Sequence, residues 1–362
     1  MHISGFRVGQ KKKIGRWIVM GFFLVLVFIT TLGKGKSQDS KGNELYFTNP
    51  VWDGADPWMT KVDNEYFYCF TVNNEIKVSQ SLKMTEMGEI KTIWEAPDDG
   101  WNQSCVWAPE IHFLDGHWYV YYAAGNSGPP YIHQRTGVLR SKDSDVFSEY
   151  EDMGVLYTGD TPEIPKSNIW AIDMTVLEYK DKLFAVWSGW KEQRDTDKTS
   201  QHIYIQKMEN PYTLIGERVL LSSPEENWET GGPLNLNEGP QILKNEDRVF
   251  IVYSCRESWL PEYRLGMLYL KKGNTDILNP DSWSKRGPVF QGTKDVHGTG
   301  HASFVMSPDG KEDWIIYHSK KGTEPGWNRD VRMQPFSWKE DGFPDFGEPL
   351  PAGEELKRPG GE

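Results

Sequence analysis

The feature that most limits the fold is a pattern that occurs five times in this chain of 362 residues. Each copy has a polar residue, a short strand-like run, a turn with charged residues or glycine, and an aromatic run that ends in a small residue. The copies begin at Asp56, Glu110, Asp173, Glu238 and His301, at intervals of 54 to 65 residues. Repeats of this length with several strands in each are typical of β-propellers.

Further strand-like runs lie between the copies, among them "EIKVSQS", "TGVLRSK", "HIYIQKM" and "LGMLYLK". Long amphipathic runs with helical period are missing after residue 40. The sequence therefore predicts an all-β chain, a five-bladed β-propeller with four antiparallel strands per blade. Because the innermost strand of each blade begins near the central channel, the five leading residues are expected to converge on one axis.

The first 36 residues differ from the rest of the chain. A basic start is followed by "WIVMGFFLVLVFITTL", an uncharged run that is shorter than the roughly 20 residues of a membrane-spanning helix. We interpret residues 1–36 as a signal peptide or an N-terminal membrane anchor, 37–48 as a linker and 49–362 as the propeller. Export to the periplasm, the cell surface or the medium is expected, with membrane contact only through such an anchor.

The charge of the chain excludes some partners. The formal net charge is −12, and residues 1–36 hold basic residues but no acidic ones, so the remainder is more acidic still. A nucleic-acid or anionic-membrane partner is therefore disfavoured. The three cysteines allow at most one disulfide and have no metal-binding spacing. A monomer without an organic cofactor is expected.

Carboxylates gathered at the end of a channel suit acid–base chemistry. Like charges raise one another's pKa, and carboxyl groups with separated pKa values can serve as acid and base. Glycoside hydrolysis uses such a pair, about 6.5–9.5 Å apart in inverting enzymes and about 5–5.5 Å apart in retaining ones. The sequence does not give this separation.

The chain resembles glycoside hydrolase family 43, five-bladed propellers that act on plant polysaccharides containing arabinose and xylose. The resemblance runs from about residue 49 to the end and is carried by "GADPWM", "WAPEIHFLDGHWYVYYAA", "WAIDMTVLE", "NEGPQILK", "GTGHASFVMSPDGKEDWIIYH" and "VRMQPFSW". It implies an inverting mechanism in which Asp56 is the general base and Glu238 the general acid. Asp173 would be the third carboxylate, which raises the pKa of Glu238 and orients it.

The resemblance also implies accessory residues around these three. Glu110 of "WAPEI" matches a position near the axis that transfers no proton, and we expect it to contact substrate. His301 matches a histidine that faces a central cation, Ca²⁺ or Na⁺, through water, although a histidine bonded to backbone and water fits equally well. Arg332 of "VRMQPF" matches an arginine that reaches into the pocket, with a structural ion pair as the alternative.

Tryptophans next to the motifs are candidates for stacking on a carbohydrate, or else for closing the blades. They are Trp58, Trp107, Trp170 and Trp190. The "WAIDMTVLE", "NEGPQILK" and "RMQPFSW" runs look most like those of exo-acting α-L-arabinofuranosidases. A β-xylosidase or exo-galactanase of the same family is the alternative, and a non-catalytic carbohydrate-binding propeller is a third possibility.

Overall fold

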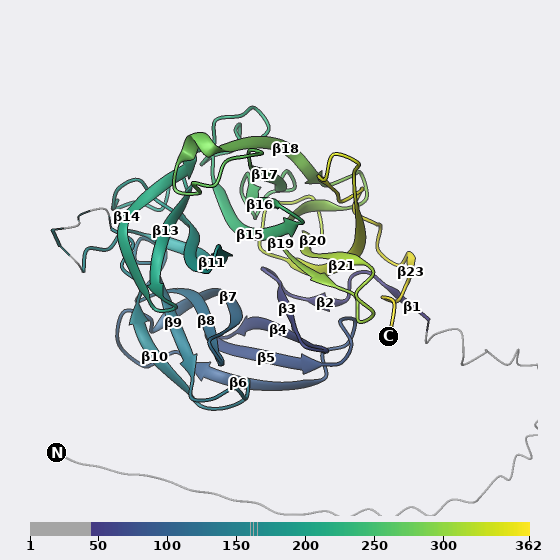
Figure 1. Cartoon of the computed structure of the whole chain (residues 1–362), viewed down its shortest axis with the longest axis horizontal. Helices are drawn as coiled ribbons and strands as arrows, with labels where there is room; N and C mark the ends of the chain where they lie inside the picture. Colours follow the sequence, from purple (N-terminus) through teal and green to yellow (C-terminus); the bar gives the residue numbers. More distant parts are fainter. Residues whose placement is uncertain (1–44, 160, 162, 165) are drawn as a thin grey trace, which may run out of the picture. The chain divides into compact units, whose positions relative to one another are not determined.

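The computed structural model describes residues 45–159, 161, 163–164 and 166–362, and these residues form five sheets around a central axis. Figure 1 shows the strands β3, β7, β11, β15 and β19 innermost, with the other strands of each blade outside them. Each blade is an antiparallel meander in which consecutive strands pair. The predicted all-β, five-bladed propeller with four antiparallel strands per blade is confirmed.

The strand bounds follow the repeat. Blade 1 contains β3 Trp58–Val62, β4 Glu65–Val72, β5 Glu75–Ser81 and β6 Glu89–Glu95. Blade 2 contains β7 Ser104–Leu114, β8 His117–Gly125, β9 Arg135–Ser141 and β10 Tyr150–Val155. Blade 3 contains β11 Ala171–Tyr179, β12 Lys182–Gly189, β13 His202–Asn210 and β14 Thr213–Ser222. Blade 4 contains β15 Asn237–Asn245, β16 Arg248–Cys255, β17 Arg264–Leu270, the 3₁₀ turn η1 Pro280–Ser282 and β18 Trp283–Gln291.

The fifth blade joins the two ends of the described chain. It contains β19 His297–Met306, β20 Asp313–Lys320 and β21 Arg329–Trp338, and its outermost strand is β2 Trp52–Asp53. The short strand β22 Pro344–Asp345 also pairs with β21, and β1 Tyr46–Thr48 pairs with β23 Glu355–Lys357. The chain therefore closes its ring by pairing its N-terminal segment with its last blade.

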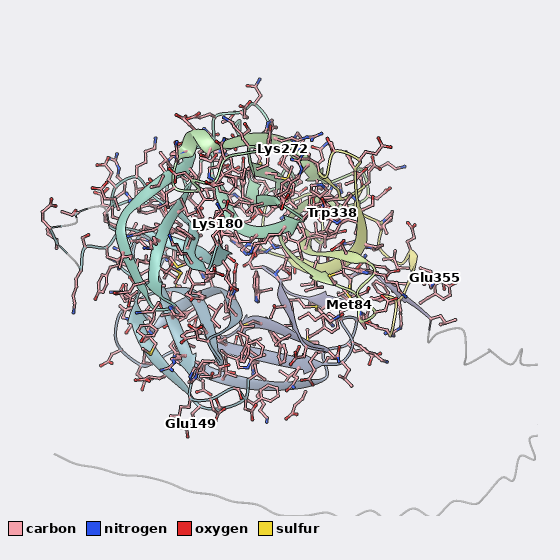
Figure 2. The ribbon with its side chains drawn as sticks, viewed as in Figure 1. Met84, Glu149, Lys180, Lys272, Trp338 and Glu355 are labelled. Atoms are coloured by element: carbon pink, nitrogen blue, oxygen red, sulfur yellow. The ribbon has the colours of Figure 1, made fainter. Side chains whose placement is uncertain are left out.

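Side chains fill the space between neighbouring blades (Figure 2). Five large clusters of buried apolar residues lie among the described residues, one between each pair of neighbouring blades. The cluster between blades 5 and 1 includes Trp314 and Met333 on one side and Met59 and Tyr68 on the other. Because an open sheet would leave two such faces in water, burial of apolar surface favours the closed ring.

The fold bears on the predicted N-terminal segments and on the cysteines. The predicted signal or anchor, residues 1–36, lies outside the described residues. The predicted linker 37–48 is too long, because β1 Tyr46–Thr48 is already paired with β23. The three cysteines are free thiols. No helix within the described ranges has the length and hydrophobicity to cross a bilayer.

Candidate active site

A shared irregularity in the innermost strands positions the site. In blades 2 to 5 the pairing of the first two strands skips two residues of the inner strand, once in blades 3 and 4 and twice in blades 2 and 5. The residue that opens the skip (the second skip in blades 2 and 5) has a left-handed backbone: Ala108 (φ 41°), Asp173 (φ 54°), Gly239 (φ 55°) and His301 (φ 46°). Asp56 (φ 50°) lies just before β3 in the same conformation. Such bulges redirect side chains, here toward the channel.

The five predicted leading residues are therefore not equivalent, and this part of the prediction is corrected. Asp56, Asp173 and His301 occupy the bulge, but Glu238 precedes it by one residue and Glu110 follows it by two. The five side chains still come close together, since Asp56, Glu238 and Glu110 all act electrostatically on Asp173 and Asp56 contacts His301. The bulge is common to these blades, and the difference is that the ionisable residue stands at a different place relative to it: Glu238 is the last paired residue before the bulge and Glu110 the first paired residue after it.

Asp56 is surrounded by nitrogen groups. One of its oxygens lies 3.1 Å from the Arg329 guanidinium, 3.3 Å from His301 Nδ1 and 3.2 Å from His318 Nδ1. Burial would raise the pKa of Asp56, but the charge of Arg329, followed by the influence of His301, outweighs it and holds the pKa well below its usual range. The Asp56 side chain is 25% exposed. It is thus an ionised carboxylate that water can reach.

The two histidines beside Asp56 have different roles. The backbone N–H of Asp56 donates to His318 Nδ1 at 3.1 Å, so a neutral His318 carries its proton on Nε2. Burial lowers the pKa of His318 to about 4, which keeps the ring neutral. His301 is also held below its ordinary pKa, chiefly by burial, and its Nδ1 faces the Asp56 carboxylate. His318 therefore holds the backbone of Asp56, while His301 faces its side chain.

Glu238 lies in a much more enclosed environment and is 7% exposed. The Tyr263 hydroxyl donates to Glu238 Oε1 at 2.9 Å, and Ser258 also bonds to this carboxyl group. Burial raises the pKa of Glu238 to about 7; the Tyr263 hydrogen bond opposes this rise, and the charge of Asp56 adds to it. Glu238 therefore keeps its proton at pH values where an ordinary glutamate has lost it.

Asp173 supports the bulge of β15 next to Glu238. Its Oδ2 accepts a 2.9 Å hydrogen bond from the backbone N–H of Gly239. Burial raises the pKa of Asp173, and the nearby charges of Glu238 and Asp56 raise it further. Because Asp173 and Glu238 disfavour each other's ionisation, the pair retains a proton well above the usual carboxyl range.

These three carboxyl groups form a set whose pKa values are pushed apart. One is ionised and open to water, and one is enclosed and protonated near neutral pH. This combination can remove a proton from water on one side of a bond and deliver a proton on the other.

Glu110 does not present a free carboxylate. It is buried, one oxygen accepts a hydrogen bond from the Gln241 amide, and the other lies 3.4 Å from His112 Nε2. Gln241 belongs to blade 4, so this contact joins blades 2 and 4 across the axis. The expectation that Glu110 binds substrate is corrected, since its oxygens are engaged with protein groups.

The candidate tryptophans separate into two groups. Trp170 and Trp190 are buried and stacked at 4.7 Å, and Trp190 is 0% exposed, so it has no face for a carbohydrate and is corrected to a core residue. Trp58 is partly buried against His112, and its indole N–H donates to the carbonyl oxygen of Ile111. Trp107 is half-buried and occupies in blade 2 the strand position that Glu238 occupies in blade 4. Trp107 thus stays a candidate for substrate contact.

The arginine at the site is Arg329, not the predicted Arg332. Arg332 is buried, pairs with Asp330 at 3.1 Å, and donates to Ser319 Oγ and to the carbonyl oxygen of Leu350. The two arginines are three residues apart on β21, so they lie on opposite faces of the strand. The alternative of a structural ion pair for Arg332 is the one that the contacts support.

Sequence reasoning missed four groups that contact the carboxylates: Arg329, His318, Tyr263 and Ser258. His318 lies near the end of β20 in the aromatic run of the fifth repeat, on the same strand face as Ile316, and this position was a usable signal. Tyr263 and Ser258 lie in the loop between β16 and β17, outside the repeat pattern, and no signal in the sequence marked them.

The described residues contain no group of three or more His, Cys, Asp or Glu side chains that could hold a metal ion. His301 has its Nδ1 on Asp56, so any cation would face its other ring nitrogen through water. The central Ca²⁺ or Na⁺ stays a prediction.

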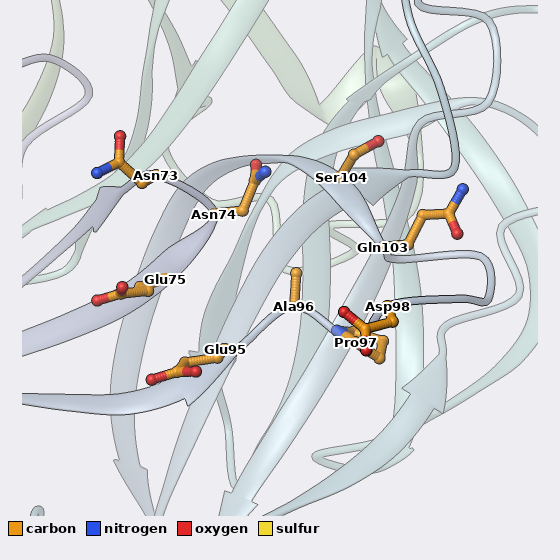
Figure 3. Close-up of a pocket in the computed structure, with 9 residues that line it drawn as sticks. All are labelled: Asn73, Asn74, Glu75, Glu95, Ala96, Pro97, Asp98, Gln103 and Ser104. Atoms are coloured by element: carbon orange, nitrogen blue, oxygen red, sulfur yellow. The ribbon is translucent and has the colours of Figure 1, made fainter.

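A pocket of about 470 Å³ lies between blades 1 and 2 (Figure 3). It is formed by the β4–β5 turn, the end of β6 and the start of β7, and its acidic lining residues are Glu75, Glu95 and Asp98. Glu75 is paired with Lys77 and Thr92. None of the predicted site residues lines this pocket.

Comparisons with known proteins show what this chain is similar to. An exo-α-(1→5)-L-arabinofuranosidase of Streptomyces avermitilis, described as extracellular, is 31% identical over 85% of this chain and 64% of its own length. Alpha-L-arabinofuranosidase 43 of Humicola insolens is 29% identical over the same shares. This chain thus spans about 64% of those relatives. The crystal structure of an α-L-arabinofuranosidase from Lactobacillus brevis matches with a TM-score of 0.76 and 31% identity, over 85% of this chain and 98% of that one. The model of glycosyl hydrolases family 43 matches residues 47–344, and the chain belongs to this family.

Proposed function

We propose that this protein is an exported, exo-acting α-L-arabinofuranosidase that hydrolyses its substrate with inversion of configuration. The observation that carries the proposal is the contrast between two carboxyl groups of one site: Asp56 is open to water and paired with Arg329, whereas Glu238 is buried and accepts the hydrogen bond of Tyr263. Burial raises the pKa of Glu238 and the charge of Arg329 helps to hold that of Asp56 low, as an acid and a base require. The sugar is suggested by the similar proteins, all three of which are named as α-L-arabinofuranosidases, and export by the Streptomyces avermitilis enzyme, which is named as extracellular. A secreted monomer that binds carbohydrate fits these properties.

In the proposed reaction Asp56 removes a proton from a water molecule, whose oxygen attacks the anomeric carbon. Glu238 gives its proton to the glycosidic oxygen as the bond to the anomeric carbon breaks, so the leaving sugar departs as an alcohol. Asp173 holds the Gly239 amide and keeps the proton on Glu238 until that step. Arg329 and His301 keep Asp56 ionised and aligned.

Two substrates with different leaving groups separate the roles of Asp56 and Glu238. On α-1,5-linked arabinobiose, whose leaving alcohol needs a proton, Glu238→Gln should lose about 10²–10⁴ of kcat/KM. On para-nitrophenyl α-L-arabinofuranoside, whose leaving group is stable as an anion, the same variant should lose far less. Asp56→Asn should be impaired on both substrates, because water attack is needed in each.

The matched control is Asp53→Asn, three residues from Asp56, whose side chain is 86% exposed and pairs with Lys321. It should keep wild-type activity. Proton NMR of the first product should show the β anomer of arabinose. Faster cleavage of xylobiose or galactobiose by the wild type would replace the arabinose assignment with the xylosidase or galactanase alternative. Binding without cleavage of any of these substrates would replace it with a carbohydrate-binding propeller.

A further inference from the structure

One tryptophan outside the predicted set is conspicuously exposed. Trp327 lies in the loop between β20 and β21, and 61% of it is accessible to solvent. Single exposed apolar residues are common and need no explanation by themselves. The position of Trp327 relative to the carboxylates is what gives its exposure a meaning.

The loop that carries Trp327 is held in place. The backbone N–H of Gly326 donates to the carbonyl oxygen of Trp259 at 2.9 Å, and the Lys320 ammonium group donates to the carbonyl oxygen of Gly326. The Lys321 N–H closes the loop on the Asn328 carbonyl oxygen at 3.0 Å. The Trp327 ring packs against the Trp259 ring with centroids 5.2 Å apart. The indole is therefore presented to solvent in a fixed orientation, at low entropic cost for a ligand.

Both indoles are connected to the catalytic carboxylates. The Arg329 guanidinium lies 5.5 Å from the centre of the Trp327 ring and donates to Asp56 Oδ1. Trp259 directly follows Ser258, which bonds to Glu238. The two loops follow β16 and β20, the second strands of the neighbouring blades 4 and 5. Trp259 and Trp327 thus form an aromatic surface at the mouth of the site.

The sugar whose anomeric carbon is attacked must lie among the enclosed carboxyl groups. A side chain at the exposed mouth of the site therefore contacts the rest of the substrate. That part is the sugar whose oxygen Glu238 protonates. We propose that Trp327, supported by Trp259, binds the leaving-group sugar by stacking on the apolar face of its ring. This inference rests on the proposed function for the identity of the sugar. Aromatic side chains suit such a surface because they offer a large, rigid apolar face.

The test compares two substrates that share the cleaved sugar, α-1,5-arabinobiose and methyl α-L-arabinofuranoside. Trp327→Ala should lower kcat/KM for the disaccharide about threefold to tenfold, the size of one aromatic contact. The methyl glycoside has no ring in the leaving group and should change less than twofold. Trp327→Phe should restore most of the loss. Tyr212→Ala is the control, since Tyr212 is another exposed aromatic residue, in the β13–β14 turn at the other end of the blades.

An equal loss on both substrates would mean that Trp327 only positions Arg329, and it would overturn the proposal, as would no loss on either. A wild type that is silent on every arabinoside would instead refute the proposed function. In that case, whether Trp327 stacks on a sugar is tested by calorimetry, which measures the binding of arabinotriose and xylotriose. Tighter binding of a trisaccharide than of its monosaccharide, lost in Trp327→Ala, supports it, and equal binding or no binding overturns it.

Discussion

Replacing Tyr263 with phenylalanine should move the alkaline limb of the pH–activity profile to higher pH. The Tyr263 hydroxyl donates to Glu238 Oε1 at 2.9 Å and lowers the pKa of that carboxyl group, while its buried ring stacks on His318 at 5.3 Å. The phenylalanine keeps the ring and removes only the donor. The acid must be protonated to work, so activity is lost as the pH rises through the pKa of Glu238.

The size of the shift follows from the hydrogen bond. A hydrogen bond to a charged group contributes about 1.5–3 kcal/mol and one to a neutral group about 0.5–1.5 kcal/mol. Loss of the donor therefore favours the protonated form by about 1–1.5 kcal/mol, which is about one pKa unit. The alkaline limb, near pH 7 in the wild type because the pKa of Glu238 is raised to about 7, should move up by about one unit.

The assay is kcat/KM for α-1,5-arabinobiose between pH 4 and 9, with released arabinose measured by anion-exchange chromatography. An aryl glycoside is unsuitable, because its leaving group hardly needs the acid. Tyr253→Phe is the matched control, since Tyr253 is a buried tyrosine whose hydroxyl donates to another carboxylate, Glu229, at 2.7 Å. An unmoved limb in Tyr263→Phe, or a limb moved to lower pH, would refute the role of this hydrogen bond.

Two further predictions concern stability. The pKa of Glu238 is raised on folding from 4.5 to about 7, so the folded state loses stability as the pH rises through this interval, by at most about 3 kcal/mol. The Glu238→Gln variant cannot ionise at this position, so its unfolding temperature should be a few degrees above that of the wild type at pH 8 and equal to it at pH 4. The same difference between variant and wild type at both pH values would contradict this. The second prediction concerns Asn49, whose side chain donates to the Met333 carbonyl oxygen at 2.8 Å and accepts from the Met333 N–H at 3.0 Å. Asn49→Ala should cost about 2–3 kcal/mol in urea unfolding, and an unchanged midpoint would show that this pair does not secure the ring closure.

The architecture could be predicted because its signal is distributed over the whole chain. Five copies of one pattern constrain the blade number even when single strands are ambiguous, and the innermost position of each first strand follows from the meander. That reasoning brought Asp56, Asp173 and Glu238 to one place although no short motif connects them. The second strand of each blade was recognisable because both its faces are covered, which gives a continuous aromatic and aliphatic run.

Register was beyond the reach of the pattern. A bulge leaves no mark in a hydrophobic pattern, so Glu238 and Glu110 were aligned with residues that they do not match. Arg332 was a candidate because "VRMQPF" resembles a family motif, and that motif does not mark Arg329, which lies three positions earlier on the opposite face of the strand and contacts Asp56. The two-residue strand β2, which completes blade 5, is too short for any periodicity to reveal it.

The bulge itself connects the conformation of the chain with its chemistry. Left-handed backbone costs a non-glycine residue of order 1–3 kcal/mol and persists where the surrounding structure enforces it. Asp56, Asp173 and His301 all adopt it, which is the cost of directing their side chains into the channel. In blade 4 the same position is Gly239, and a Cβ there would lie 3.1 Å from Cγ and Nδ1 of His301. A glycine at this position therefore leaves room for the His301 ring, which contacts Asp56. The Gly239 N–H donates to Asp173, and Glu238 is the residue directly before Gly239. Glu238 therefore lies one residue before the bulge position that Asp173 and His301 occupy in their blades, because in blade 4 the residue at the bulge position has to be small.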